Sequence, residues 1–178
     1  MGGWRGLGII EGQRNSRRYD TRKMGKRQRG VGWRYLHAAV DDHTRLAYVE
    51  LHDDQKAVSA VAFTQRAVAW FAQRGINVEA VMTDNGSCYV SHLYQDALAG
   101  AGIDHIRTRP RRPQTNGKVE RFNRTLSEEW AYIELYESET ERTAALAHWI
   151  HTYNHHRHHT AIGGPPITRV TNLPSQYI

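Results

Sequence analysis

The sequence predicts an α/β domain, because strand-like and helix-like runs alternate along most of its 178 residues. Two runs rich in β-branched and aromatic residues, 33–40 and 46–52, flank the polar connection DDHTR and should pair as an antiparallel hairpin. Apolar residues at helical spacing then cover 56–74, and Gly75 stands where a helix stop belongs. The length suits one domain with its own core.

The second half of the chain continues the alternation. After a short buried strand, the pattern predicts a helix that ends in glycines, a further strand, a Pro-rich loop RPRRPQTNG and two longer helices. The expected elements are strand 78–83, helix 91–102, strand 103–108 and helices 118–135 and 139–156. This order predicts a mixed sheet flanked by helices.

Several large aromatic residues lie at positions that predict a core. The stripe consists of Trp70, Phe71 and Trp149, and the same interpretation applies to Trp130 and Tyr132.

Cysteine content and hydropathy set the expected compartment. Cys88 is the single cysteine, so an intramolecular disulfide is excluded and a reducing cytoplasm is the simplest location. No segment approaches the roughly 18 consecutive apolar residues that a membrane helix needs, and the N-terminus lacks the pattern of a signal peptide. We expect a soluble cytoplasmic protein with no membrane partner.

Charge is uneven along the chain, although the total is only +6. Residues 1–34 carry ten Lys or Arg and two acidic residues, a net of +8, whereas the remainder has fourteen basic and sixteen acidic residues, a net of −2. Residues 1–32 are therefore predicted to form a basic, partly disordered arm, which either binds phosphates or is a solvated tail. A second basic cluster surrounds the Pro-rich loop, and two such clusters favour nucleic acid as a partner.

Two carboxylates on separate elements form the candidate site. Asp84 follows the strand at 78–83, in the stretch MTDNGSCYV, and Glu120 lies 35 intervening residues downstream in the first turn of a helix. The pair Asn85-Gly86 is also typical of an ordinary tight turn. Carboxylates at a strand end and a helix start can converge on Mg²⁺, which prefers oxygen ligands and usually takes one or two protein carboxylates. This is the outline of a phosphoryl-transfer site.

Three motifs resemble those of one family. TDNGS, RPRRPQTNGKVERFNRTL and YNHHRHH followed by GGPP are similar to the integrase catalytic core of bacterial insertion-sequence transposases, relatives of retroviral integrases with a DDE triad. The resemblance implies an RNase H-like fold, with a core domain at 33–160 and a C-terminal tail at 161–178. It also implies that Asp84 is the second acid and Glu120 the third, together binding Mg²⁺ or Mn²⁺ in a two-metal site.

Basic and polar residues beside Glu120 are candidates for DNA contact. The predicted DNA-binding residues are Lys118, Arg121, Arg124, Asn116 and Gln114. Arg121 and Arg124 share a helix face by their spacing and suit phosphate contact, although ion pairing with Glu128 is the competing interpretation.

The first acid of the triad is the point of departure from the family. Aligned on Leu7-Gly8, the chain has Gly3 where that aspartate should stand, so the first strand is expected to be missing or degenerate. YDTRKMG echoes the same motif and offers Asp20, but the stretch before it is a poor strand. Asp41 and Asp42 fall in the predicted hairpin turn, where aspartate is ordinary turn chemistry.

A histidine cluster near the C-terminus could bind a transition metal if it were helical. No acid or cysteine accompanies its members, which are His155, His156, His158 and His159. Arg157-His158-His159 also departs from the Arg-Pro-His that is usual in the family. The neighbouring Tyr153 and Asn154 are expected to pack the last helix onto the core.

Two functions of different class follow. One is a transposase or integrase catalytic domain that carries out metal-dependent DNA strand transfer, by in-line displacement at phosphorus with two ions, on transposon ends and target DNA as a possible homo-oligomer. The other is a truncated, inactive remnant that only binds nucleic acid.

Overall fold

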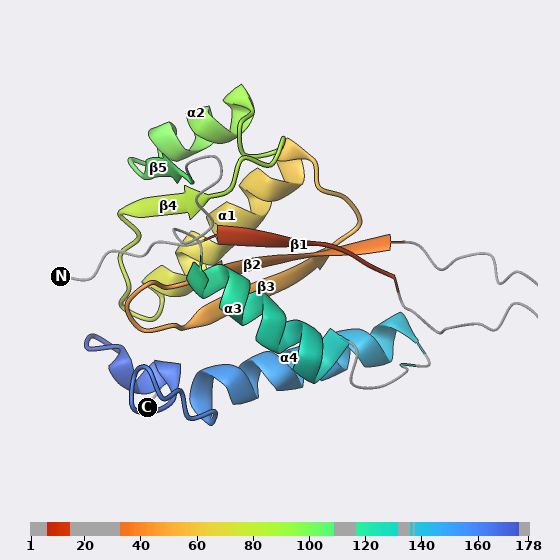
Figure 1. The fold of residues 1–178 in the computed structure, drawn as a ribbon. Helices are drawn as coiled ribbons and strands as arrows, with labels where there is room; N and C mark the ends of the chain where they lie inside the picture. Colours follow the sequence, from red (N-terminus) through yellow and green to blue (C-terminus); the bar gives the residue numbers. More distant parts are fainter. Residues whose placement is uncertain (1–6, 15–32, 109–116, 132–135, 137, 175–178) are drawn as a thin grey trace, which may run out of the picture.

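The computed structural model describes residues 7–14, 33–108, 117–131, 136 and 138–174 (Figure 1). In these residues five strands and four α-helices follow one another: β1 (Leu7–Arg14), β2 (Trp33–Val40), β3 (Ala47–His52), α1 (Ala57–Ala72), β4 (Ala80–Thr83), α2 (His92–Gly100), β5 (Asp104–Arg107), α3 (Gly117–Leu126) and α4 (Glu139–His155). A π-helical turn, Ser127–Ala131, extends α3, and a 3₁₀ turn, Pro166–Arg169, follows α4. Within the described residues, no helix combines the length and apolar character that crossing a bilayer requires.

The strands form two sheets. β1, β2 and β3 pair antiparallel in that order, with Leu7 and Tyr48 both opposite Ala39, whereas β4 and β5 pair in parallel. The β2–β3 hairpin, α1, β4, α2 and β5 confirm the predicted alternation, with ends that differ by a few residues.

The first strand, which was expected to be missing or degenerate, is present as β1. β1 pairs with β2 over most of its length, with a register irregularity between Ile10 and Gln13. Residues 7–14 of the predicted basic arm therefore belong to the sheet. Among the described residues, however, no ladder joins β1 to β4, so the sheet is divided at this strand.

Side chains alternate between the two faces of β2, as a pleated strand requires. Leu36, Ala38 and Val40 pack against α3, its π turn and α4, whereas Ala39 packs toward α1. Figure 1 shows α1 on one side of the three-stranded sheet and α3 with α4 on the other. The two cores hold the predicted aromatic residues: Phe71 and Trp130 are buried, and Trp70 and Trp149 are partly buried against them. Tyr132 lies outside the described residues.

The turn after α1 depends on a glycine. Gly75 has a φ of +75°, and a Cβ added there would lie 2.2 Å from the backbone oxygen of Asn172. We expect Gly75→Ala to lower the free energy of unfolding by about 2 kcal/mol, because it adds a backbone clash to the cost of a left-handed conformation.

The matched control is Gly102→Ala. Gly102 has a φ of +67° but open space around its Cβ position. Its replacement should cost only about 1 kcal/mol in urea unfolding. Equal losses in the two variants would show that the approach of Asn172 contributes nothing.

Candidate functional site

Asp84 directly follows β4, in a segment that two side-chain hydrogen bonds hold in place. Its Oδ1 accepts a hydrogen bond from the backbone N–H of Gly86 at 2.8 Å, and the side chain is exposed. Asn85 donates from Nδ2 to the carbonyl of Thr108 at 2.9 Å, which ties this segment to the one after β5. The Asn-Gly pair forms a bend and not the expected tight turn, because Gly86 does not have a positive φ and the hydrogen-bonded turn follows it at 87–89. The hydrogen bond from Gly86 N–H fixes the Asp84 carboxylate at the carboxyl end of β4.

Glu120 lies in the first turn of α3. The helix buries Val119, Phe122 and Leu126 against the sheet, so that Glu120 faces solvent. A carboxylate in the first turn of a helix is stabilised by the helix dipole. Within the described part of the chain, Glu120 has no hydrogen bond or ion pair, which leaves its oxygens available to a cation.

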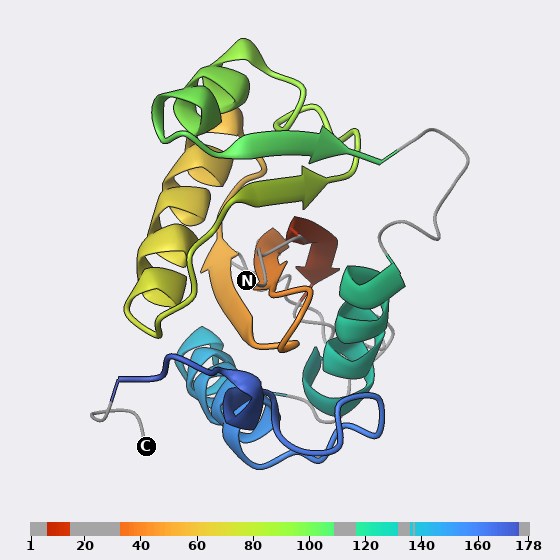
Figure 2. The ribbon, with the colours of Figure 1, turned by 90° about the vertical axis from the view of Figure 1, so that its left-hand side faces the viewer.

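The elements that carry these two acids face the same side of the molecule. Figure 2 shows the carboxyl ends of β4 and β5 and the first turn of α3 together at one side. Two exposed carboxylates fit Mg²⁺ or Mn²⁺ as oxygen ligands. Among the described residues, no group of three or more His, Cys, Asp or Glu side chains could hold a metal ion.

The predicted DNA-binding residues differ in their surroundings. Lys118 is held by the β2–β3 turn, because its Nζ pairs with the Asp42 carboxylate and donates to the Asp42 carbonyl at 3.2 Å. Arg121 and Arg124 are exposed and make no ion pair with Glu128 in the described part of the chain. Gln114 and Asn116 lie outside the described residues. Sequence spacing gave no signal for the Lys118–Asp42 contact, which joins positions 76 apart.

The alternatives for the first acid are placed only in part. Gly3 and Asp20 lie outside the described residues. Asp41 is buried, and its Oδ2 accepts from both the backbone N–H of Thr44, at 2.8 Å, and its hydroxyl, at 2.5 Å. This confirms that Asp41 is a structural residue of the hairpin turn.

The expected packing of the last helix is confirmed. Tyr153 and Asn154 are buried, and the Asn154 amide bonds both the backbone N–H and the carbonyl of Ala47, at 2.9 and 2.8 Å. This contact fastens α4 to the first residue of β3.

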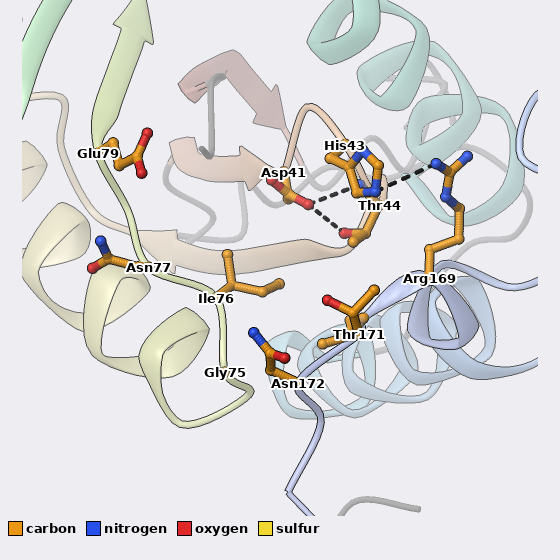
Figure 3. Close-up of a pocket in the computed structure, with 11 residues that line it drawn as sticks. Asp41, His43, Thr44, Gly75, Ile76, Asn77, Glu79, Arg169, Thr171 and Asn172 are labelled. Atoms are coloured by element: carbon orange, nitrogen blue, oxygen red, sulfur yellow. Dashed lines mark hydrogen bonds between the residues drawn. The ribbon is translucent and has the colours of Figure 1, made fainter. Parts of the chain in front are cut away.

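A cavity of about 530 Å³ lies at the opposite end of β4 (Figure 3). Its lining includes Glu79, which directly precedes β4, together with Asp41, Ile76 and Asn172. Since Asp84 follows the strand and Glu79 precedes it, this cavity is separate from the candidate carboxylate site.

Comparisons with known proteins agree on one family. A family model described as "Integrase core domain" matches residues 18–113, and a second model with the same description matches residues 101–166. The putative integrase ORF3 of Spiroplasma virus SpV1-C74 is 26% identical over 141 residues, which cover 72% of this chain and 39% of that protein. The insertion element IS476 uncharacterized 39.2 kDa protein of Xanthomonas euvesicatoria is 31% identical over 98 residues, which cover 54% of this chain and 28% of that protein. The chain thus spans less than half the length of these relatives.

Solved structures confirm the fold class. The HTLV-2 integrase catalytic core domain in complex with magnesium has a TM-score of 0.68 at 15% identity, covering 96% of this chain and 98% of that one. The catalytic core domain of BIV integrase has a TM-score of 0.63 at 22% identity, covering 77% and 85%. The fold is therefore the predicted RNase H-like fold.

Proposed function

Because the chain belongs to the integrase core domain family, we propose that it is the catalytic core of a transposase or integrase that transfers DNA strands with the help of divalent metal ions. The observation that supports this most is the placement of Asp84 and Glu120, both exposed, on the ends of two elements that face one side of the fold. We propose transposon ends and target DNA as its substrates and a homo-oligomer in the bacterial cytoplasm as its working form.

In this proposal Asp84 and Glu120 hold Mg²⁺ or Mn²⁺. The metal supplies charge stabilisation and an activated oxygen nucleophile for in-line displacement at phosphorus. The Asp84 segment contributes rigidity, since one carboxylate oxygen is already held by Gly86 N–H. The start of α3 holds Glu120 on an exposed, regular backbone, so little ordering is needed when the cation binds.

The exposed face of α3 supplies the phosphate contacts. Arg121 and Arg124 lie one turn apart and are exposed beside Glu120. Arginine on such a face suits backbone phosphates, whose neutralisation makes binding salt-dependent. Lys118, being paired with Asp42, positions the start of α3 against the hairpin turn and is a weaker candidate for DNA contact. Gln114 and Asn116 remain proposed contacts of the loop before α3.

A second candidate function rests on the incomplete acid set. Among the described residues no third His, Cys, Asp or Glu side chain joins Asp84 and Glu120 in a group that could hold a metal ion, and a shared metal site is weakened severely by one missing ligand. The alternative is therefore a core that binds nucleic acid without cutting it. Asp20 is the proposed replacement for the first acid in the catalytic case.

Calorimetric titration with Mn²⁺ tests the catalytic proposal. We expect the wild-type chain to bind Mn²⁺ and both Asp84→Asn and Glu120→Gln to abolish binding, because each removes a charged oxygen ligand. Glu128→Gln, an exposed acid in the π turn after α3, is the matched control and should bind as wild type does. Asp84→Asn and Glu120→Gln should also lose Mn²⁺-dependent nicking of supercoiled DNA. The effect of Asp20→Asn on binding and nicking shows whether Asp20 completes the site.

Absence of Mn²⁺ binding by a folded chain would reject the catalytic proposal in favour of the nucleic-acid-binding one. In that case affinity for DNA should fall steeply with salt, and Arg121→Ala and Arg124→Ala should each reduce the salt slope by about one.

A further inference from the structure

Three imidazole rings gather at the carboxyl end of α4. His151 Nε2 lies 3.2 Å from His156 Nε2, and the ring of His155 stacks on that of His151 with 4.6 Å between centroids. His151 and His156 are exposed. The sequence spacing of five is possible because α4 ends at His155 and the backbone of His156 turns out of the helix, with φ −125° and ψ −29°.

The distance between the two nitrogens suits a shared metal ion. At a separation of 3.2 Å, a metal placed about 2.0–2.1 Å from each nitrogen would subtend an angle of about 103°. This value lies between the ~90° of square-planar or octahedral coordination and the ~109° of a tetrahedron.

The orientation of the rings agrees with the distance. Two rings that aim their nitrogens at one such metal have centroids roughly 5.0 Å apart, because each ring centre lies about 1.15 Å behind its nitrogen. Two rings that meet head-on in a straight hydrogen bond of the same length have centroids roughly 5.5 Å apart. The observed separation of the His151 and His156 centroids is 5.1 Å.

We propose that His151 and His156 chelate a divalent transition metal such as Ni²⁺, Cu²⁺ or Zn²⁺, with water in the remaining positions. Imidazole ligands suit these metals, whereas Mg²⁺ takes oxygen ligands. The stacked ring of His155 restricts the rotation of His151, and the helix carboxyl end favours a cation. The site is thus distinct in ligand chemistry from the carboxylates Asp84 and Glu120. It shares only His156 with the cluster singled out in the sequence, which consisted of His155, His156, His158 and His159.

Titration of the whole, untagged chain with Ni²⁺ tests this site. The buffer contains about 10 mM Mg²⁺, so that carboxylate ligands are already occupied by Mg²⁺. We expect one Ni²⁺ per chain, with affinity lowered at least about tenfold by His151→Asn and by His156→Asn, since each removes one of two ligands. His148→Asn and His158→Asn replace exposed histidines in the same region and should leave the affinity unchanged, as should Glu120→Gln.

A second measurement needs no variant. In the wild-type chain, Ni²⁺ should protect His151 and His156 from modification by diethyl pyrocarbonate, read by mass spectrometry, and leave His158 reactive. The proposal is overturned if Ni²⁺ does not bind saturably, if the control variants lose as much affinity as the pair, or if protection does not fall on these two residues.

Discussion

Replacing Trp130 with alanine is expected to lower the free energy of unfolding by about 3–5 kcal/mol, as for other large buried aromatic residues. Trp130 is 1% exposed and lies in the π turn that extends α3. Its indole N–H donates to the carbonyl of Arg142 at 3.2 Å, and the Tyr136 hydroxyl donates to the backbone carbonyl of Trp130 at 2.9 Å. The guanidinium of Arg142 lies 5.0 Å from the ring centre. Truncation therefore leaves a cavity and also removes the hydrogen bond from the indole to the Arg142 carbonyl.

Urea unfolding at pH 7 measures this loss. Leu93→Ala is the control, because Leu93 is a large apolar residue that is 49% exposed, and it should change stability by no more than about 0.5 kcal/mol. A loss below about 1 kcal/mol for Trp130→Ala would mean that the packing of α4 onto the π turn does not stabilise the domain. The size of this loss in unfolding free energy also shows how far packing around Trp130 stabilises α3, the helix that carries Glu120.

Local patterns predicted most of the elements because their signals are local. The alternation over 33–40 and 46–52 and the helical spacing over 56–74 specify structure without reference to the rest of the chain, and the structure has β2, β3 and α1 there. The helix expected over 118–135 instead changes to a π turn at Ser127. Apolar spacing continues through Trp130, so periodicity alone gives no sign of this change.

The first strand shows where local signals fail. Gly8 interrupts the only short apolar run of residues 7–14, and Glu11 and Gly12 end it. The strand conformation of this stretch depends on pairing with residues 33–39 of β2, far along the chain. The same limit applies to the contacts of Lys118 with Asp42 and of His151 with His156. The first needs two elements to meet, and the second needs a helix to end at one particular residue. Asp84 and Glu120 were accessible to sequence reasoning because each lies at the end of an element with a strong local pattern.

Acidification is expected to destabilise the domain by about 3 kcal/mol through His37 alone. His37 lies in β2 with 0% of its surface exposed, between the rings of His52, at 4.5 Å, and Phe63, at 5.2 Å. Neither of its ring nitrogens has a hydrogen-bond partner among the described residues. Burial, reinforced by the charge of His52, lowers the pKa of His37 from 6.5 to about 4, against the opposing effects of Asp54 and Glu50.

The sign follows from which state takes up the proton. Between pH 6.5 and about 4, the unfolded chain carries a protonated His37 and the folded chain a neutral one, so the unfolded state binds more protons. The stability that neutral His37 permits is fully present above pH 6.5 and is lost as the pH falls toward 4, at up to about 1.4 kcal/mol per pH unit. Burial alone would raise the pKa of Glu50, but its hydrogen bonds to Arg66, Tyr48 and His52 lower that pKa from 4.5, so the stability that Glu50 contributes is present above pH 4.5 and is lost as the pH falls below that value.

Replacing His37 with phenylalanine isolates this effect. The aromatic ring is retained against Phe63, while the titrating group is removed, so stability at pH 7 should stay close to that of the wild type. The decline in unfolding free energy between pH 6.5 and 4 should become flatter by up to one proton per molecule. His158→Gln, at an exposed position, should keep the wild-type slope. If His37→Phe keeps the wild-type slope as well, His37 is not the group that takes up a proton on unfolding, and the pH dependence comes from another residue.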